Sequence, residues 1–170
     1  SGIYIGNSSP AISGNTASSN ANYGIYITGA AVPATVTGNT LTGNALGPVG
    51  MAADSSATVV ADSNTFTGPL YIDGGSLTKN TTWGNSQTYY IRGSITVNTG
   101  VTLTIPAGRL VKFAQNTGIY VNGTLSAVGA SASGQQITFT DYRDDAAGGD
   151  TNGDGVASSP GAGWWLGIHI

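Results

Sequence analysis

The feature that most constrains this chain is a four-residue phrase, Gly-Ile-Tyr-Ile, that returns along the sequence in slightly altered form. The two identical copies begin 22 residues apart. This interval is typical of one coil of a β-solenoid and is too short for a propeller blade. Because one such coil cannot bury an apolar face alone, coils must stack on one another. The copies and variants of the phrase occupy residues 2–5, 24–27, 118–121 and 167–170.

A second phrase, Gly-Asn-Thr or Ser-Asn-Thr, keeps step with the first and contains Asn15, Asn39 and Asn64. Asn and Gly tolerate the left-handed backbone conformation that tight corners require. The spacing predicts that these asparagines lie above one another in successive coils. They serve either as simple turn residues or as a ladder in which each side-chain amide bonds the next.

Short runs of alternating apolar and polar residues, separated by Gly and Asn, indicate strands and turns throughout, and no window shows helical periodicity. The predicted fold is all-β: a β-solenoid of about seven coils of 22–25 residues, with uncapped ends. We expect a single continuous solenoid over residues 1–170. Its parts are a short-repeat section (1–70), an irregular junction (71–88), and a longer-strand section (89–170) with an Asp-rich loop (141–161).

The composition excludes several classes of protein. Charged residues make up 8% of the chain, the net charge is -3, and the five basic residues form no stripe, which argues against nucleic-acid binding. No apolar stretch is long enough to span a membrane. The polar, nearly uncharged surface favours an extracellular or cell-surface location. The chain opens in mid-repeat, so we expect a mature piece or a segment of a longer polypeptide.

Strand-and-turn phrases occupy residues 97–108 (Val-Asn-Thr-Gly-Val-Thr-Leu-Thr-Ile-Pro-Ala-Gly), 111–113, 121–125, 127–129, 137–140 and 150–155. These segments resemble the right-handed parallel β-helix repeat proteins of bacterial cell surfaces, and residues 7–16 resemble that family's shorter repeats. The resemblance implies a rod of triangular coils with three parallel strands per coil, usually in secreted or surface-anchored proteins. It says little about activity, because one fold serves many functions.

The Asp-rich loop contains Asp-Thr-Asn-Gly-Asp-Gly at residues 150–155, which places oxygen ligands at alternate positions as in the first half of an EF-hand loop. The twelfth position is Gly161, where an EF-hand has a bidentate Glu, so nearby aspartates must supply the missing ligands. We expect one structural calcium ion here, with an ordinary Asp/Asn/Gly surface loop as the alternative. The predicted ligands are Asp150, Asn152, Asp154, Asp144 and Asp145.

Other side chains suggest binding rather than catalysis. Tyr4, Tyr26 and Tyr120 share one phrase and form an aromatic column that holds sugars, packs filaments side by side, or only stabilises the sheet. No cluster of paired carboxylates recurs, so we predict no catalytic residue and no enzyme activity. The Thr-x-Thr phrases are too irregular to favour an ice-binding plane.

Strand-forming phrases lie at both termini of the chain, and solenoid ends that carry no cap expose backbone groups to a neighbour. We therefore expect a non-enzymatic structural extracellular protein that stacks end-on into a fibre or long surface rod. Its partner is a second copy, in a head-to-tail homopolymer, or flanking repeats of a longer chain. The alternatives are a carbohydrate-binding or adhesin module, a polysaccharide lyase and an ice-binding protein. The predicted end residues are Ile3, Tyr4, Ile5, Ile168, His169 and Ile170.

Overall fold

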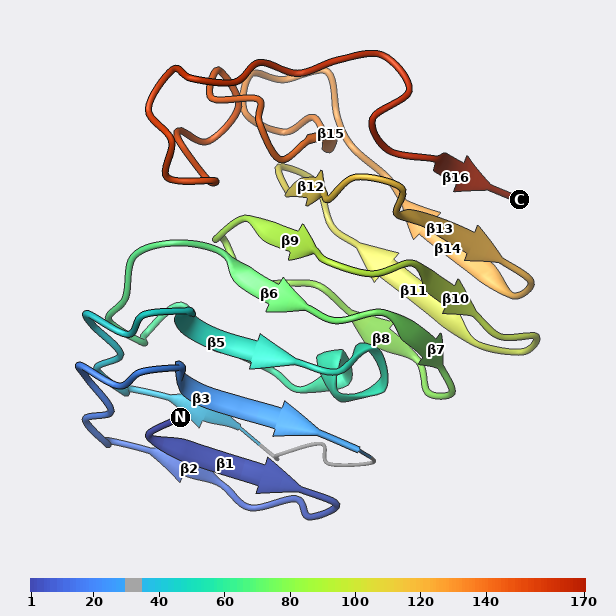
Figure 1. Cartoon of the computed structure of the whole chain (residues 1–170). Helices are drawn as coiled ribbons and strands as arrows, with labels where there is room; N and C mark the ends of the chain where they lie inside the picture. The colour runs from blue at the N-terminus through green and yellow to red at the C-terminus, as the bar shows by residue number, and fades with distance from the viewer. Residues whose placement is uncertain (30–34) are drawn as a thin grey trace.

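The computed structural model describes residues 1–29 and 35–170. These residues form a parallel β-solenoid with almost no helix, as the repeat predicts (Figure 1). Every strand pairing in the described part of the chain is parallel, because each strand bonds to its equivalents in the coils before and after it (order β1-β3-β5-β6-β9-β12-β15 on the longest sheet).

The strands gather into flat sheets that run along the solenoid axis (Figure 1). The longest sheet contains β1 (Ile3–Gly6), β3 (Tyr23–Thr28), β5 (Gly47–Met51), β6 (Leu70–Ile72), β9 (Tyr89–Ile91), β12 (Leu110–Phe113) and β15 (Thr138–Asp141). A second sheet contains β7 (Gly75–Leu77), β10 (Ile95–Val97), β13 (Gly118–Val121) and β16 (Gly167–His169), with the 3-10 helix η1 (Ala53–Ala57) beside β7. A third contains β8 (Thr81–Thr82), β11 (Thr102–Ile105) and β14 (Thr124–Ala127), and β2 (Ile12–Ser13) pairs with β4 (Val36–Thr37).

The core is a column of stacked apolar side chains. On the longest sheet Ile27 lies beside Met51, which lies beside Ile72, and the series continues through Ile91 to Phe113. Each of these side chains is essentially buried. Because apolar burial contributes about 25 cal/mol per Å², these contacts between successive coils stabilise the stack.

The coil count is about five turns, slightly fewer than the seven predicted. Within the described residues the longest sheet carries seven strands, but the other faces carry fewer. The first coils use two-residue strands or single bridges on those faces, such as the bridge between Thr16 and Thr40. Full three-sided pairing is therefore confined to part of the rod.

Residues 71–88 are the segment predicted as an irregular junction between the two sections. The segment contains most of β6 and all of β7 and β8. Trp83 is fully buried, stacks on Tyr89 at 5.3 Å between ring centroids, and donates its Nε1–H to Ser56 Oγ at 3.1 Å. Gly74 lies where a Cβ would be 3.0 Å from the backbone of Gly93. The glycines and the tryptophan thus serve close packing between coils.

After β15 the chain leaves the regular coil and returns only at Trp164, which begins the approach to β16. We call residues 142–163 the insertion; it is drawn in orange to red near the C-terminal end in Figure 1. The insertion folds against the outer face of the longest sheet, where it covers Lys112 of β12 completely. The Lys112 ammonium donates hydrogen bonds to the Gly149 carbonyl, at 2.9 Å, and to Thr151 Oγ1.

Candidate functional site

The outer face of the longest sheet carries a continuous series of aromatic rings. The strand register places Tyr4 of β1 beside Tyr26 of β3, and Tyr71 of β6 beside Tyr90 of β9. We call this series the tyrosine face. Its successive ring-centroid distances are 5.9 Å (Tyr4–Tyr26), 5.5 Å (Tyr26–Tyr23), 5.5 Å (Tyr23–Tyr71), 5.6 Å (Tyr71–Tyr90) and 5.4 Å (Tyr90–Tyr142).

A glycine in the middle of the sheet makes this series continuous. Gly50 of β5 occupies the outward position between Tyr26 and Tyr71. The ring of Tyr23 fills the space above Gly50, where a Cβ would come within 2.7–2.9 Å of three ring atoms. Gly47 accommodates the ring of Tyr71 in the same way, with a Cβ position 2.2 Å from the nearest ring atom. The two glycines of β5 therefore allow aromatic rings to lie directly on the sheet.

An ion pair crosses the tyrosine face. Arg92 donates from Nε to Asp73 Oδ1 at 3.1 Å and from Nη2 to the same oxygen, while Tyr26 donates its hydroxyl to Asp73 Oδ2 at 2.8 Å. The guanidinium lies over the rings of Tyr23 and Tyr71 at 5.5 and 5.6 Å. Partial burial opposes the charge of Arg92, but the hydrogen bonds and charge of Asp73 raise its pKa overall. Burial, then the hydrogen bond to Asp73, raises the pKa of Tyr26.

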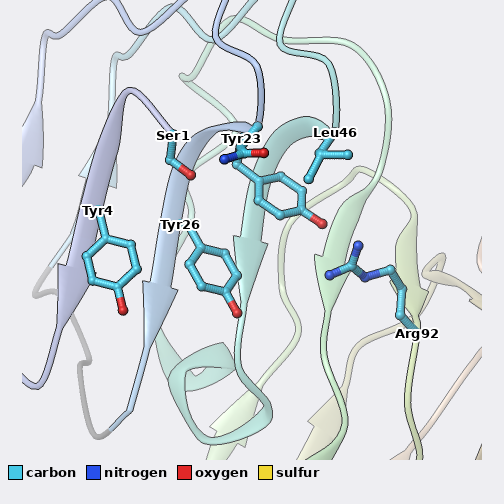
Figure 2. Close-up of a pocket in the computed structure, with 7 residues that line it drawn as sticks. Ser1, Tyr4, Tyr23, Tyr26, Leu46 and Arg92 are labelled. Carbon is cyan, nitrogen blue, oxygen red and sulfur yellow. The ribbon is translucent and has the colours of Figure 1, made fainter.

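A surface pocket of about 400 Å³ opens at the N-terminal end of the tyrosine face. Figure 2 shows the rings of Tyr4 and Tyr26 side by side in front of the first strands, with the Tyr23 ring next to them and Arg92 reaching toward the Tyr23 hydroxyl. Tyr4 is 67% exposed, whereas Tyr23 is 4% exposed and its buried hydroxyl has no hydrogen-bond partner among the described residues. The pocket is lined by Ser1, Tyr4, Asn22, Tyr23, Tyr26, Leu46 and Arg92.

The insertion closes the opposite end of the tyrosine face. Tyr142 stacks on Tyr90 with an interplanar angle of 15°, and Arg143 lies 3.4 Å from the ring centroid of Trp164. Next along the sheet from Tyr90 is Lys112, which the insertion covers. The exposed aromatic surface therefore ends where the insertion begins.

The structure brings together three of the five predicted calcium ligands. Asp145, Asp150 and Asp154 each offer a carboxylate oxygen, and these oxygens lie within 4.8 Å of one another. Asp145 Oδ1 is a buried oxygen with no hydrogen-bond partner among the described residues. Asp150 accepts backbone N–H groups from Gly153, at 2.7 Å, and Gly155, at 2.8 Å; such hydrogen bonds lower the pKa of Asp150.

The other two predicted ligands, Asp144 and Asn152, do not belong to this group of three carboxylates. Asp144 Oδ2 accepts the hydroxyl of Thr140 at 2.7 Å, on the strand β15 side of the loop. Asn152 Nδ2 donates to Asp154 Oδ2 and to Ser158 Oγ, each at 2.9 Å. Lys112 also faces this loop: burial lowers its pKa, and the negative charges of the surrounding aspartates oppose that shift.

The asparagines of the second phrase lie one above another, and their amides form a ladder. The backbone N–H and Nδ2 of Asn15 donate to Asn39 Oδ1 at 2.9 and 3.1 Å, and the same two groups of Asn39 donate to Asn64 Oδ1 at 2.9 Å each. A second ladder, which the sequence analysis did not identify, joins Asn20 to Asn44 Oδ1 at 3.0 and 2.8 Å. Its signal in the sequence is a second asparagine five residues after the first.

The predicted end residues lie on edge strands of the described structure. Ile3, Tyr4 and Ile5 belong to β1, the first strand of the longest sheet. Ile168 and His169 belong to β16, where the His169 ring stacks on Tyr120 at 4.9 Å, and Ile170 is 96% exposed. Tyr120 therefore lies on a different sheet from Tyr4 and Tyr26, and the predicted column of these three tyrosines is corrected to two tyrosines on one face and one on another.

Comparison with known proteins bears on the first coils. Residues 1–66, fewer than half of the 170, match the protein-family model described as right handed beta helix region. The solenoid is a right-handed β-helix. No curated protein and no solved structure matches the chain. No helix in the described part of the β-helix is long and apolar enough to cross a membrane.

Proposed function

We propose that this β-helix is a non-enzymatic extracellular binding module whose tyrosine face holds a glycan. The observation that carries the proposal is the pocket in which two adjacent rings, Tyr4 and Tyr26, form the floor beside Arg92. Such concave sites combine apolar and aromatic walls with a few polar groups that fix orientation. The nearly uncharged, polar composition of the chain supports the extracellular location.

The chemistry of the pocket suits a sugar ring. A pyranose presents C–H groups on its faces, which pack against aromatic rings, and hydroxyls on its edge. The ring of Tyr4 offers an exposed apolar face, while Arg92 Nη1, which makes no hydrogen bond with the described residues, and the exposed Asn22 side chain offer polar groups. Flat aromatic side chains lose little conformational entropy on binding.

The absence of catalysis is part of the proposal. Glycoside cleavage needs a pair of carboxylates free to act as acid and as base or nucleophile. Three aspartates are committed to ion pairs: Asp54 with Lys79, Asp73 with Arg92, and Asp141 with Arg143. Among these three ion-paired aspartates, Asp73 is the one that lies beside the pocket. Both of its carboxylate oxygens accept hydrogen bonds.

A glycan array followed by calorimetry tests the glycan-binding proposal. Tyr4→Ala and Tyr26→Ala should each weaken binding of the selected glycan at least about tenfold, the equivalent of about 1.4 kcal/mol. Tyr120→Ala is the matched control, because it removes a tyrosine from the second sheet and should leave affinity unchanged. Equal loss in all three variants, or no glycan bound by the wild-type protein, would refute the proposal.

A second candidate function, end-on association, is favoured by the polarity of the asparagine ladders. In both ladders the oxygen of one asparagine accepts N–H groups from the coil on its N-terminal side. At the first coil, Asn15 Oδ1 and Asn20 Oδ1 receive no such bonds from the described residues. Residues 123–137, at the C-terminal end, contain no asparagine. The first coil is therefore better matched to a flanking coil of the short-repeat type than to the C-terminal coil of a second copy.

Adding one coil tests this preference. A copy of residues 23–46 fused ahead of residue 1 should raise the free energy of unfolding, because it supplies amide donors to both open oxygens. The same copy carrying alanine in place of its two ladder asparagines should give a clearly smaller gain. An equal gain from both fusions would show that the ladder asparagines do not contribute to the contact between coils. If the unmodified protein forms polymers whose amount depends on concentration, a second copy would be the favoured partner.

We also propose that the Asp145–Asp150–Asp154 cluster holds one structural calcium ion, supported by the buried Asp145 oxygen that lacks a partner. Hard Ca²⁺ prefers carboxylate and carbonyl oxygens. Added CaCl2 should raise the melting temperature of the wild-type protein, and Asp145→Asn should abolish the increase. A melting temperature that neither calcium nor a chelator alters would contradict this proposal.

A further inference from the structure

The charges of the tyrosine face are balanced inside the face itself. Asp73 Oδ1 accepts two N–H groups of Arg92, and Asp73 Oδ2 accepts the hydroxyl of Tyr26. Arg92 is the only arginine, lysine or aspartate among the pocket-lining residues. Its positive charge is thus already neutralised by a neighbour before any ligand arrives.

The ion pair with Asp73 neutralises the charge of Arg92 and also fixes the position of its side chain. Two N–H groups on one carboxylate oxygen hold the guanidinium above the rings of Tyr23 and Tyr71, so that Nη1 is directed away from Asp73. The side chains of Arg92 and Asp73 are 34% and 29% exposed, so solvent reaches both. An incoming anionic group would have to displace Asp73 from Arg92 or share the one guanidinium with that carboxylate.

The geometry points to Asp73 as the residue that restricts the tyrosine face to uncharged glycans. This inference rests on the proposed glycan-binding function. Neutral sugar hydroxyls accept a hydrogen bond from Arg92 Nη1 without disturbing the pair. A uronic acid or sulfated sugar meets like charge at Asp73, and such a repulsive element is a common means of excluding a competing ligand.

Replacement of Asp73 by Asn tests the inference. The amide keeps the shape of the carboxylate and one of its two acceptor oxygens but removes the negative charge, which leaves Arg92 free to pair with an anionic sugar. Asp73→Asn should therefore gain at least about tenfold in affinity for uronic acid oligosaccharides, and this gain should decrease with salt. Affinity for uncharged oligosaccharides should change less. Asp62→Asn is the matched control, since it alters net charge equally but lies outside the pocket.

The probes are glucose, mannose, galactose and xylose oligosaccharides together with uronic acid oligosaccharides of equal length. Wild-type protein that binds an uncharged probe and rejects the uronic acids supports the inference. Wild-type protein that binds both classes equally, or Asp73→Asn protein without a gain for uronic acids, overturns it while the binding function stands. If neither class binds either protein, the proposed function fails as well.

A measurement on the wild-type protein keeps the test independent of how the variant folds. Any weak affinity for the uronic acid probe should rise with salt concentration, because salt screens its repulsion by Asp73. A steep loss of that affinity as salt rises would mean that the sugar carboxylate pairs with Arg92 directly, and it would overturn the inference.

Discussion

At the scale of single residues, polar atoms inside this β-helix fall into two groups. Asn39, in the middle of a ladder, is fully buried, and its Nδ2 donates to oxygens of Ile12, Thr37 and Asn64. The hydroxyl of Tyr23 is buried without a partner among the described residues. Buried polar groups are normally paired. The ladder bonds stabilise the coil stack, whereas the unpaired Tyr23 hydroxyl lies at the proposed binding surface.

Asn39→Ala should destabilise the protein by about 3 kcal/mol, because it removes the hydrogen bonds of the buried Asn39 side chain to Asn15, Ile12 and Asn64. Asn15→Ala, at the exposed end of the same ladder, should cost clearly less. Urea unfolding of both variants measures the difference. Equal costs would show that the ladder position is irrelevant.

Tyr23→Phe should change the stability at alkaline pH. Burial raises the pKa of Tyr23 to about 12, from 10.0, in an environment that also contains Arg92, Asp73, Tyr71 and Tyr26. A raised folded-state pKa favours the unfolded state once pH exceeds the unfolded value, so stability is lost between about pH 10 and pH 12. The phenylalanine variant should lose less stability over this range, because it lacks the phenol whose deprotonation favours the unfolded state.

The reference for that comparison is the same variant at neutral pH. There, removal of an unpaired buried hydroxyl should leave stability equal or raise it by about 1 kcal/mol. Identical alkaline profiles for the two proteins would mean that Tyr23 does not titrate in this range.

Residue spacing explains what the sequence could predict at this scale. Asn15, Asn39 and Asn64 recur at intervals of one coil, so their alignment follows from the period alone. Tyr23 is not part of the repeated phrase, and its place in the tyrosine face depends on Gly50 one coil later. Gly50 has no side chain, and the contact that this allows with Tyr23 leaves no periodic signal in the sequence.

At the scale of elements, β5 determines the shape of the tyrosine face. Gly50→Ala should displace the Tyr23 ring, because the new Cβ would lie 2.7–2.9 Å from three ring atoms. We expect a loss of about 1–3 kcal/mol in stability, as for other overpacked sites, together with weaker glycan binding. Gly84→Ala is the control, since its nearest neighbour is Thr82 at 3.8 Å, and its effect should be small. Similar effects of the two substitutions on binding would contradict the account.

The side chain of Lys112 holds the insertion against the longest sheet. Lys112→Met removes the donor to Gly149 and Thr151 and the cation that faces the Asp-rich loop. Hydrogen exchange in residues 144–155 should become about tenfold faster, the equivalent of losing one charge-assisted hydrogen bond. Lys79→Met, which removes a partly exposed ion pair with Asp54 elsewhere, should leave this segment unchanged. Unaltered exchange after loss of Lys112 would mean that other contacts hold the insertion.

The insertion also shows where sequence reasoning stopped. The high density of aspartate and glycine marked residues 141–161 as a loop, but nothing local to that segment indicated which surface it covers. The information lies in Lys112, thirty residues earlier, which reads as an ordinary outward residue of a strand. The predicted junction at 71–88 illustrates the same limit: Trp83 and the glycines interrupt the sequence pattern, but they pack closely between coils.

At the scale of the whole molecule, the rod separates two kinds of surface. Seven strands about 4.8 Å apart give the longest sheet a length of about 29 Å, and the tyrosine face runs along its side. The asparagine ladders and edge strands face along the axis instead. Side binding and end-on association therefore use different groups and can be tested separately. Fold class was predictable because every coil repeats the same constraint, whereas the binding surface arises where single coils depart from it.

The most direct test of the central claim is a nuclear magnetic resonance titration of isotope-labelled protein with the tightest-binding uncharged oligosaccharide. The account predicts that amide shifts concentrate in β1, β3 and β5 and around Asp73 and Arg92. Shifts concentrated in β10, β13 and β16, or only at the ends of the rod, would contradict it.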